Sequence, residues 1–246
     1  MRLDKFLCEM KIGTRSQVKG ILRQGLVTVN GITAKNADMK IDETADQICF
    51  RGQLLRYQRF VYYMMNKPKG VVSAVRDNTA PTVVSLLENC NREDIFPVGR
   101  LDKDTTGLMF LTNDGNLAHR LLSPKRHVDK TYRVTIAHPL TEKEKELLEQ
   151  GVDIGDEALT MPARVETLSE TTILLTIQEG RFHQVKRMLQ AAGNSVLELE
   201  RISLGGLLLD KELKPGEYRE LTAGEVECCY MAAFGAEGTE LEVDNE

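Results

Sequence analysis

The stretch GRLDKDTTGL, residues 99–108, places a cluster of charged side chains directly before an apolar run, MFLT, that ends at the turn signal NDG. The apolar run has the pattern of a short buried strand. Charged groups that enter a core are normally paired or remain solvated. Arg100 and Asp102 are therefore expected to form either a structural ion pair at the start of a strand or the floor of a reactive pocket.

A second carboxylate, Asp104, follows Asp102 two residues later. Paired carboxylates carry out acid–base and covalent chemistry at glycosidic carbons. We expect these two to point to opposite faces of an extended segment, so that only one reaches the pocket floor and the other faces solvent. The threonines that follow and the small Gly107 are expected to let a substrate approach closely.

The composition is typical of a soluble globular chain with one large or two small domains, because 41% of the 246 residues are hydrophobic and 28% are charged. The five cysteines form no CxxC pair and the four histidines show no ligand spacing, so we expect reduced thiols and no bound metal. No apolar stretch approaches the ~20 residues of a membrane span, and no secretory h-region is visible. We therefore expect a cytoplasmic protein with no membrane partner.

The net charge of -5 hides an uneven distribution of charge along the chain. Residues 1–59 hold eleven basic and six acidic side chains, whereas residues 217–246 hold one basic and nine acidic side chains. A basic front end with an acidic tail often accompanies nucleic-acid binding. The charge pattern therefore favours a nucleic-acid partner that the overall charge would not suggest.

Residues 14–25 have the pattern of a short capped helix. The letters TRSQ at its start match a capping box, and Gly25 is a stop signal. Arg15, Lys19 and Arg23 are spaced by four and form a basic stripe along one face. Asn30-Gly31, between two short alternating runs, predicts a β-hairpin. From the residues alone, the stripe is either a phosphate-binding surface or an ordinary solvated helix face.

The letters RLDKFL, the striped helix and GLVTVNG together resemble the alpha-L type of RNA-binding domain over about the first 45 residues. In that family the helix stripe and the hairpin hold RNA phosphates. The resemblance implies this RNA-binding role for Arg15, Lys19 and Arg23, with an RNA-binding domain over residues 1–58.

From residue 60 onward, strands and helices alternate without a regular βαβ rhythm, which predicts an α+β domain with a mixed, largely antiparallel sheet and flanking helices. This domain is expected over residues 60–234, followed by an acidic, disordered tail over residues 235–246. Expected strands lie at 71–74, 108–111, 132–136, 173–177 and 196–202. Expected helices lie at 82–87, 116–121, 141–150 and 182–192.

The opening stretch, extended to GRLDKDTTGLMFLTNDG, resembles the active-site segment of pseudouridine synthases, most closely of their RsuA branch. Four more segments with family counterparts follow the expected order around it: NKPKGVVSA, SPKRHVDKTYRV, LLTIQEGRFHQVKRMLQAAG and RISLGGLLLDKELKPGEYRELT. Together these five segments carry the resemblance over about residues 2–225. The resemblance implies isomerisation of uridine to pseudouridine in ribosomal RNA, a reaction that needs no cofactor.

The same resemblance implies three catalytic residues, Asp102, Tyr132 and Lys186. Asp102 would act at the ribose, either by attack on C1′ or by removal of a C2′ proton. Lys186, where many relatives carry arginine, would hold that carboxylate ionised. Tyr132 would stack on the uracil and transfer a proton.

The resemblance also implies three substrate-binding residues. Arg100 would fill the space that the flipped uridine leaves, and Leu175 and Ile177 would form an apolar wall. The alternatives without a functional role are that Tyr132 is a half-buried strand residue and that Lys186 is an exposed charge on a helix.

Small-subunit ribosomal RNA is the favoured substrate, because the letters QVKRM and the closing segment most resemble the member of the branch that acts on small-subunit RNA. The alternatives are a large-subunit enzyme of the same branch, a noncatalytic RNA chaperone or ribosome-assembly factor that binds RNA, and a nucleoside or glycoside hydrolase that uses Asp102 with Asp104. The protein is expected to act as a monomer, on RNA alone or within an assembling ribosomal subunit.

Overall fold

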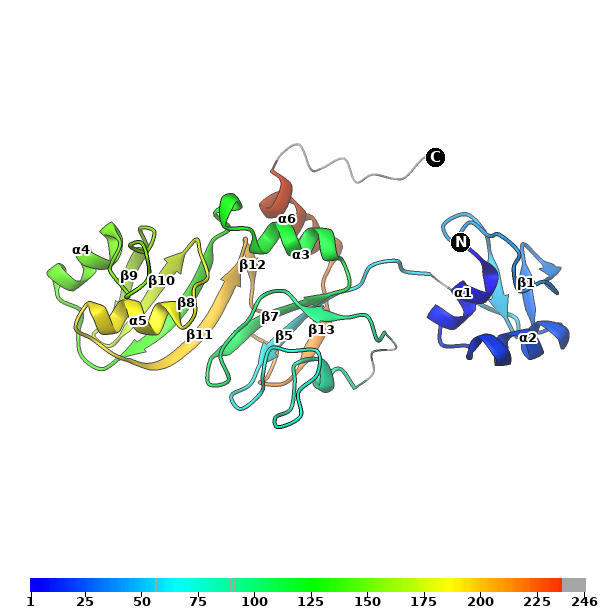
Figure 1. The fold of residues 1–246 in the computed structure, drawn as a ribbon, viewed down its shortest axis with the longest axis horizontal. Helices are drawn as coiled ribbons and strands as arrows, with labels where there is room; N and C mark the ends of the chain where they lie inside the picture. Colours follow the sequence, from blue (N-terminus) through cyan, green and yellow to red (C-terminus); the bar gives the residue numbers. More distant parts are fainter. Residues whose placement is uncertain (56, 89, 91, 236–246) are drawn as a thin grey trace. The chain divides into compact units, whose positions relative to one another are not determined.

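The computed structural model describes residues 1–235 except positions 56, 89 and 91. The chain divides into two compact units, which are considered separately (Figure 1). The first unit comprises Met1–Phe60 and a short segment that ends at Asp94. The second comprises Val61–Glu88 and the chain from Ile95 onward. The predicted disordered tail lies outside the described residues, apart from Gly235.

The first unit packs two helices against a small antiparallel sheet whose strands follow the order β2-β1-β3-β4. Its elements are α1 (Leu3–Glu9), α2 (Arg15–Arg23), β1 (Val27–Val29), β2 (Ile32–Thr33), β3 (Ile48–Phe50) and β4 (Gln53–Leu54). The predicted capping box is present, because the Thr14 hydroxyl accepts from the Gln17 backbone and the Gln17 side chain accepts from the Thr14 backbone. Asn30 and Gly31 both have positive φ, 51° and 78°, as a tight hairpin turn requires.

The core of the first unit explains why α2 presents its basic stripe outward. Val18 and Leu22 are buried on one face of α2, against Leu3, Phe6 and Leu7 of α1. Because the apolar face is fixed against α1, the other face is left to solvent.

Among the described residues, the second unit is built on a nine-stranded sheet, with the order β13-β5-β7-β11-β8-β10-β9 along its main path. Neighbouring strands are antiparallel except for β7 and β11, which run parallel. The main strands are β5 (Tyr62–Lys67), β7 (Thr106–Thr112), β8 (Lys130–Ile136), β9 (Arg164–Ser169), β10 (Thr172–Ile177), β11 (Val196–Leu204) and β13 (Tyr218–Glu220). Two short strands, β6 (Phe96–Pro97) and β12 (Leu207–Leu208), pair with β7 and β11. The predicted α+β class with a mixed sheet is confirmed.

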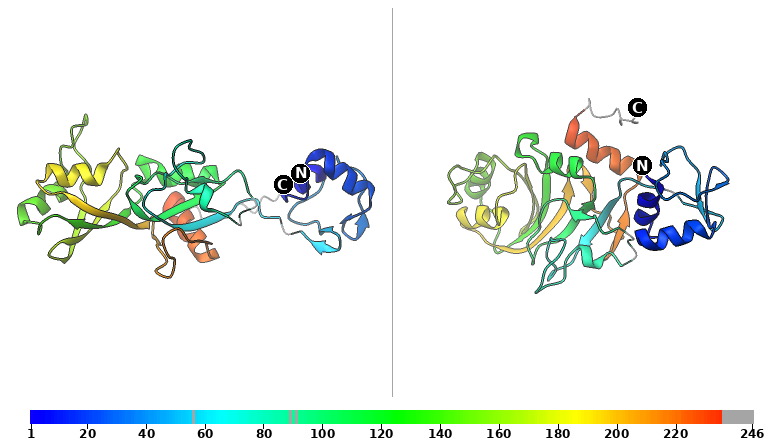
Figure 2. Two further views of the ribbon diagram at one scale, coloured as in Figure 1. Left: turned by 90° about the horizontal axis from the view of Figure 1, so that it is seen from below. Right: turned by 45° about the vertical axis from the view of Figure 1, so that its right-hand side comes forward.

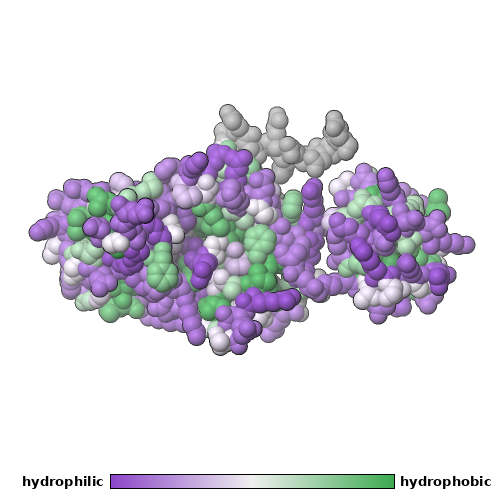
Figure 3. Space-filling view, viewed as in Figure 1, coloured by the Kyte–Doolittle hydropathy of each residue, from purple (hydrophilic) through white to green (hydrophobic). Residues whose placement is uncertain are grey.

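Helices pack on this sheet as two separate pairs (Figures 1 and 2). They are α3 (Gly115–Leu122), α4 (Glu142–Gln150), α5 (Gln184–Ala191) and α6 (Ala223–Phe234). Helix α4 packs on β9 and α5 on β11, whereas α3 and α6 pack on each other. Met64, Phe110, Leu121 and Cys229 belong to the buried cluster beneath that second pair. On the face shown in Figure 3, hydrophilic residues dominate the surface and hydrophobic ones form smaller patches.

Several predicted elements differ from the structure. Residues 71–74 form no strand, because the chain leaves β5 at Lys67-Pro68 and only Val72 makes an isolated bridge, to Thr82. The helix predicted at 82–87 is a single 3-10 turn, Val84–Leu86. Helix α6 was not predicted, because it lies in an acidic stretch and buries only small side chains, Cys229 and Ala233, which leave a weak apolar pattern in the sequence.

Candidate active site

The segment that carries Asp102 is a turn that leads into β7. The backbone amide of Thr105 donates to the carbonyl of Asp102 at 3.1 Å, which folds the segment back on itself. The neighbouring chain after β5 holds this turn at two further points. Gly70 N donates to the Lys103 carbonyl at 2.8 Å, and the Ser73 hydroxyl bonds both the amide and the carbonyl of Leu101.

Lys67, the last residue of β5, anchors the same turn from beneath. Its side chain is fully buried, and its ammonium donates to the carbonyls of Thr105 at 2.7 Å and Pro68 at 3.1 Å. Burial lowers the pKa of Lys67 to about 8, against the opposing effect of the Asp104 and Asp102 carboxylates. No role for Lys67 could be inferred from the sequence, although its segment, NKPKG, belongs to the family resemblance.

Asp102 contacts two side chains of the α5 region, Lys186 and His183. Its carboxylate is 3.2 Å from the Lys186 ammonium and 3.5 Å from His183 Nε2. Its side chain remains 29% exposed, so the group is accessible from the pocket. The predicted partnership of Asp102 with Lys186 is therefore present in the structure, while Arg100 forms no ion pair with Asp102 among the described residues.

Asp104 contacts the same ammonium more closely than Asp102 does, because both of its oxygens accept from Lys186 Nζ, at 2.7 and 2.9 Å. The expectation that Asp102 and Asp104 face opposite sides is wrong. Alternate residues of a strand share a face, and this segment is in any case a turn rather than extended backbone. The two carboxylates thus converge on one cation.

These contacts set the ionisation of the cluster. Burial disfavours charge on Lys186, but its hydrogen bonds to Asp104 and Asp102 outweigh burial and raise its pKa. The hydrogen bond from Lys186 in turn lowers the pKa of Asp104. The ammonium therefore stays protonated beside both carboxylates at neutral pH.

Asp102 and Tyr132 line one pocket. Tyr132 projects from β8, is 8% exposed and faces the pocket. The lining residues come from the turn before β7, from β8, from the end of β10, from the segment that leads into α5 and its first turn, and from β11. They include Arg100, Leu101, Asp102, Thr105, Tyr132, Ile177, Arg181, His183, Lys186 and Leu199. The pocket therefore combines a carboxylate, a phenol and an apolar wall.

The predicted apolar wall is only half present at the pocket surface. Ile177 lines the pocket, but Leu175 is fully buried and is not among the lining residues. Leu175 lies directly opposite Tyr132 on the paired strands β10 and β8, so it supports the tyrosine from the side. Arg100 is exposed and also lines the pocket.

Arg201 of β11 lies opposite Tyr132 on the other side of β8. Its side chain is almost completely buried, and its Nε donates to the Leu108 carbonyl at 2.8 Å. Within the described residues, its Nη2 atom has no hydrogen-bond partner. Burial lowers the pKa of this guanidinium, and the oxygen of Tyr132 is the group that acts in the opposite direction. Neither residue reasoning nor the family resemblance had identified Arg201.

Gly107 serves the sheet rather than the substrate. Its φ is +95°, and a Cβ atom there would lie 2.3 Å from the carbonyl oxygen of Arg201. Glycine is needed because the parallel strands β7 and β11 approach closely at this point. The expectation that Gly107 gives access to a substrate is therefore wrong.

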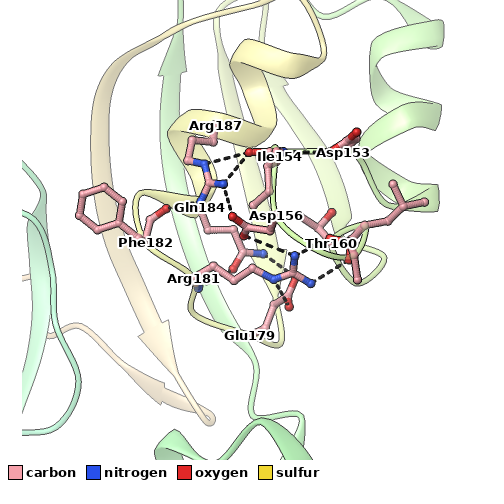
Figure 4. A network of polar contacts seen from close by, with 12 residues as sticks. Asp153, Ile154, Asp156, Thr160, Glu179, Arg181, Phe182, Gln184 and Arg187 are labelled. Carbon is pink, nitrogen blue, oxygen red and sulfur yellow. Dashed lines mark hydrogen bonds and ion pairs between the residues drawn. The ribbon is translucent and has the colours of Figure 1, made fainter.

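A polar network holds the segment between β10 and α5 (Figure 4). Arg181 donates to Glu179 and to the carbonyls of Ala158 and Leu159. Arg187 donates to the Ile154 carbonyl and pairs with Asp156. Both arginines are thus committed to this network, which leaves Lys186 as the residue of the RFHQVKR stretch whose ammonium reaches Asp102.

His183 is the other pocket residue that sequence reasoning missed. It precedes Lys186 by three residues and caps α5, so both side chains lie on one side of the helix start. That spacing was a usable signal. The turn that brings Asp104 to Lys186 had no comparable signal, because it depends on contacts with residues 67–73.

In the first unit, Arg15, Lys19 and Arg23 are all exposed on α2, as the stripe pattern predicts. Across the described positions, no group of three or more His, Cys, Asp and Glu side chains is arranged to hold a metal ion. In the same part of the chain, no helix has the length and apolar character needed to cross a membrane.

Comparison with known proteins identifies both units. A family described as RNA pseudouridylate synthase matches residues 61–191, and the S4 domain family matches residues 1–48. A ribosomal small subunit pseudouridine synthase A of Vibrio cholerae is 44% identical over 227 residues, which cover 92% of this chain and 98% of the relative. An uncharacterized RNA pseudouridine synthase of Bacillus subtilis is 46% identical over 231 residues, which cover 92% of this chain and 97% of the relative.

A relative in Escherichia coli strain K12, also named ribosomal small subunit pseudouridine synthase A, is 42% identical over 228 residues, covering 92% of this chain and 98% of the relative. A crystal structure of a pseudouridylate synthase matches with a TM-score of 0.67 and 42% identity, covering 93% of this chain and 99% of that one. These matches confirm the resemblance drawn from the five sequence segments. The chain belongs to the RNA pseudouridine synthases, with an S4 domain ahead of its synthase domain.

Proposed function

We propose that this chain isomerises uridine to pseudouridine in small-subunit ribosomal RNA, with Asp102 as the catalytic carboxylate. The observation that carries the proposal is the position of Asp102 on the pocket lining, paired with Lys186 and His183 and facing the same pocket as Tyr132. The choice of RNA is supported by the relatives in Vibrio cholerae and Escherichia coli, whose names specify the small ribosomal subunit.

The reaction breaks the bond from uracil N1 to ribose C1′, turns the base and joins C5 to C1′. C5 loses its proton and N1 takes one up, so the product is an isomer of uridine. It involves no net oxidation and no hydrolysis. Asp102 acts at the sugar, either by attack on C1′ or by removal of the C2′ proton. Lys186 orients the carboxylate through an ion pair at 3.2 Å, and His183 makes a second contact, with its Nε2 atom 3.5 Å from the carboxylate.

Tyr132 stacks on the uracil and transfers a proton, with Leu175 behind it on β10 and Arg201 beside it on β11. Ile177 supplies the apolar wall against which the base turns. Arg100, exposed at the pocket edge, fills the space that the flipped uridine leaves in the RNA.

Thr105, one of the two threonines that were expected to lie beside the substrate, adds a polar group to the pocket. Its hydroxyl is buried at the pocket and has no hydrogen-bond partner among the residues described. A buried polar group without a partner is costly unless a ligand satisfies it. We assign this hydroxyl to a hydrogen bond with the bound nucleotide.

The basic stripe on α2 is proposed to hold RNA phosphates, because three exposed cations at helical spacing match the repeating charge of a nucleic-acid backbone. We further propose that the protein acts as a monomer in the cytoplasm and that its substrate is a ribosomal RNA within an assembling small subunit.

Asp102 and Asp104 converge on one cation, so an opposite orientation of the two carboxylates cannot be held against the hydrolase alternative. It is disfavoured because both carboxylates share one ammonium rather than flanking a space for water. Membership in a synthase family likewise disfavours a noncatalytic assembly factor.

One assay separates the candidates. The protein is incubated with unmodified small-subunit or large-subunit ribosomal RNA transcripts that carry tritium at uracil C5. Tritium release from the small-subunit transcript alone supports the proposal, and release from the large-subunit transcript alone overturns the choice of RNA. Free uracil would indicate hydrolysis, and binding without either product would indicate an assembly factor.

A further inference from the structure

The segment that leads into α5 carries a phenylalanine that is exposed beside the pocket. Phe182 is 74% exposed, although phenylalanine side chains are usually buried in a core. Its ring stacks on the imidazole of His183, with ring centroids 3.8 Å apart and planes 19° apart. Because His183 Nε2 lies 3.5 Å from Asp102, the Phe182 ring is one aromatic ring away from the catalytic carboxylate.

The backbone around Phe182 is held in place, so the exposure does not follow from a loose loop. The Phe182 carbonyl accepts from Arg187 Nη1 at 2.9 Å, and the amide of Arg181 donates to Gln184 Oε1 at 2.9 Å. In Figure 4 the arginine network lies on one side of this segment, while the Phe182 ring points away from it into open space. His183 adopts φ +49°, which is uncommon for a residue with a side chain and directs the imidazole next to that ring.

The charges near this aromatic pair suit a polyanion. Lys69, Lys103 and Lys186 line the surface hollow that also contains His183 and the carboxylates of Asp102 and Asp104. Lys69 also pairs with Glu198 at 3.3 Å, and the exposed Arg100 lines the adjoining pocket. A nucleic-acid strand that enters the pocket would pass these cations with its phosphates. An apolar protein surface would not pair with these cations.

We propose that Phe182 and His183 form a stacking platform for the base of the nucleotide next to the target uridine. A uridine that is flipped into the pocket leaves its neighbour without a stacking partner. One face of the Phe182 ring is covered by His183, so the side chain can offer its open face to that base. Such a platform accepts any base, because every base has a π-face. The inference deepens the proposed function, since it rests on uridine isomerisation at this pocket.

The test compares the full-length chain with Phe182→Ala, Phe182→Leu and Phe182→Tyr in the tritium-release assay. Leu208→Ala serves as a matched control, because Leu208 is 67% exposed on β12 and lies outside the pocket lining. Loss of the platform should raise KM for the RNA about 10-fold or more in the Ala and Leu variants, given the usual strength of base stacking on aromatic rings. The Tyr variant should stay within about 3-fold of the parent, and kcat should change little in all variants.

A second measurement reports stacking directly. A transcript can carry 2-aminopurine next to the uridine that the parent chain modifies. Its fluorescence should fall when the parent chain binds, and it should fall clearly less with saturating Phe182→Ala. Unchanged KM in Phe182→Ala, or parent-like behaviour of Phe182→Leu, would overturn the platform. Absence of tritium release by the parent chain on the small-subunit transcript would instead overturn the proposed substrate, and the platform would then be tested on whichever transcript is modified.

Discussion

Lys186 at the pocket and Lys19 on α2 are both helix lysines, but their surroundings differ. Lys186 is 27% exposed and lies 2.7 and 3.2 Å from two carboxylates. Lys19 is exposed on a stripe with Arg15 and Arg23, and forms no ion pair within the described residues. Like charges four residues apart destabilise a helix slightly, so the stripe is maintained at a small cost to the fold.

The difference between these two sites follows from solvent screening. At the pocket, partial burial strengthens each charge interaction, so geometry decides which carboxylate is held and where it points. On α2, water and salt weaken each interaction, so the number of cations matters more than their placement. Variants at the pocket should therefore change the rate of reaction, and variants on α2 should change RNA affinity and its salt dependence.

Asp102→Asn should produce the largest effect. Asparagine keeps the size and polarity of the side chain but supplies neither a nucleophile nor a base. Tritium release should fall by at least about 1,000-fold, while RNA binding in a filter assay stays within a few-fold of the parent. Substantial turnover by this variant would remove Asp102 from the catalytic role and would leave the pocket without its central group.

Lys186→Met comes next, because it removes the charge that both carboxylates share and keeps most of the apolar stem. Turnover should fall by about 100-fold or more with an unchanged circular dichroism spectrum. Lys186→Arg should retain part of the activity, limited by the fit of the larger guanidinium. A folded Lys186→Met variant with near-normal turnover would make Lys186 an exposed charge like Lys19.

Lys67 extends the comparison to a fully buried lysine. Its pKa in the folded state is about 8, below the ~10.4 of an unfolded chain, because burial disfavours the charged form. Below pH 8 both states are protonated, and the folded state bears the full cost of the buried charge. Between pH 8 and about 10.4 the unfolded state binds more protons, so stability rises with pH, by up to about 3 kcal/mol from this residue.

Lys67→Met should therefore flatten part of this rise. Urea unfolding of parent and variant at several pH values from 7 to 10 would measure it. Burial also lowers the pKa of Lys130 to about 8. The free energy of unfolding of the variant should therefore still rise with pH, through Lys130, but by less than in the parent. Parallel stability curves for parent and variant would show that Lys67 does not titrate in this range.

The sequence predicted helix α2, its exposed basic stripe and the following hairpin turn almost completely, because a helix stripe, a capping box and an Asn-Gly turn are local signals. It proposed Asp102, Tyr132 and Lys186 as catalytic residues only through resemblance, and it assigned no role to Lys67, His183 and Arg201. The positions of these residues depend on hydrogen bonds and strand pairings between segments 30 to 100 residues apart in the chain, such as Lys67 with Thr105 and Arg201 with Tyr132. Spacing alone could not show that Asp104 turns toward Lys186.

Replacing Arg15, Lys19 and Arg23 together by alanine should weaken RNA binding through the loss of phosphate contacts. The slope of log affinity against log salt should fall by about 2 to 3 units if all three residues contact phosphates. The rate at saturating RNA should stay close to that of the parent, because none of the three lines the pocket that holds Asp102. An unchanged slope would return the stripe to a solvated helix face.

Asp104→Asn should have the smallest effect. It tests a pair in which an exposed carboxylate contacts the partly buried lysine of the pocket. Asp104 makes the closer contact with Lys186, but its side chain is 69% exposed, so water screens the pair as it screens the cations of α2. Asparagine can still accept one hydrogen bond from the ammonium, and Asp102 would become the principal anionic partner of Lys186. We expect kcat to change by no more than about 5-fold, with RNA affinity unchanged. A loss as large as that of Asp102→Asn would instead make Asp104 a catalytic partner, and the two carboxylates would have to be treated as one coupled pair.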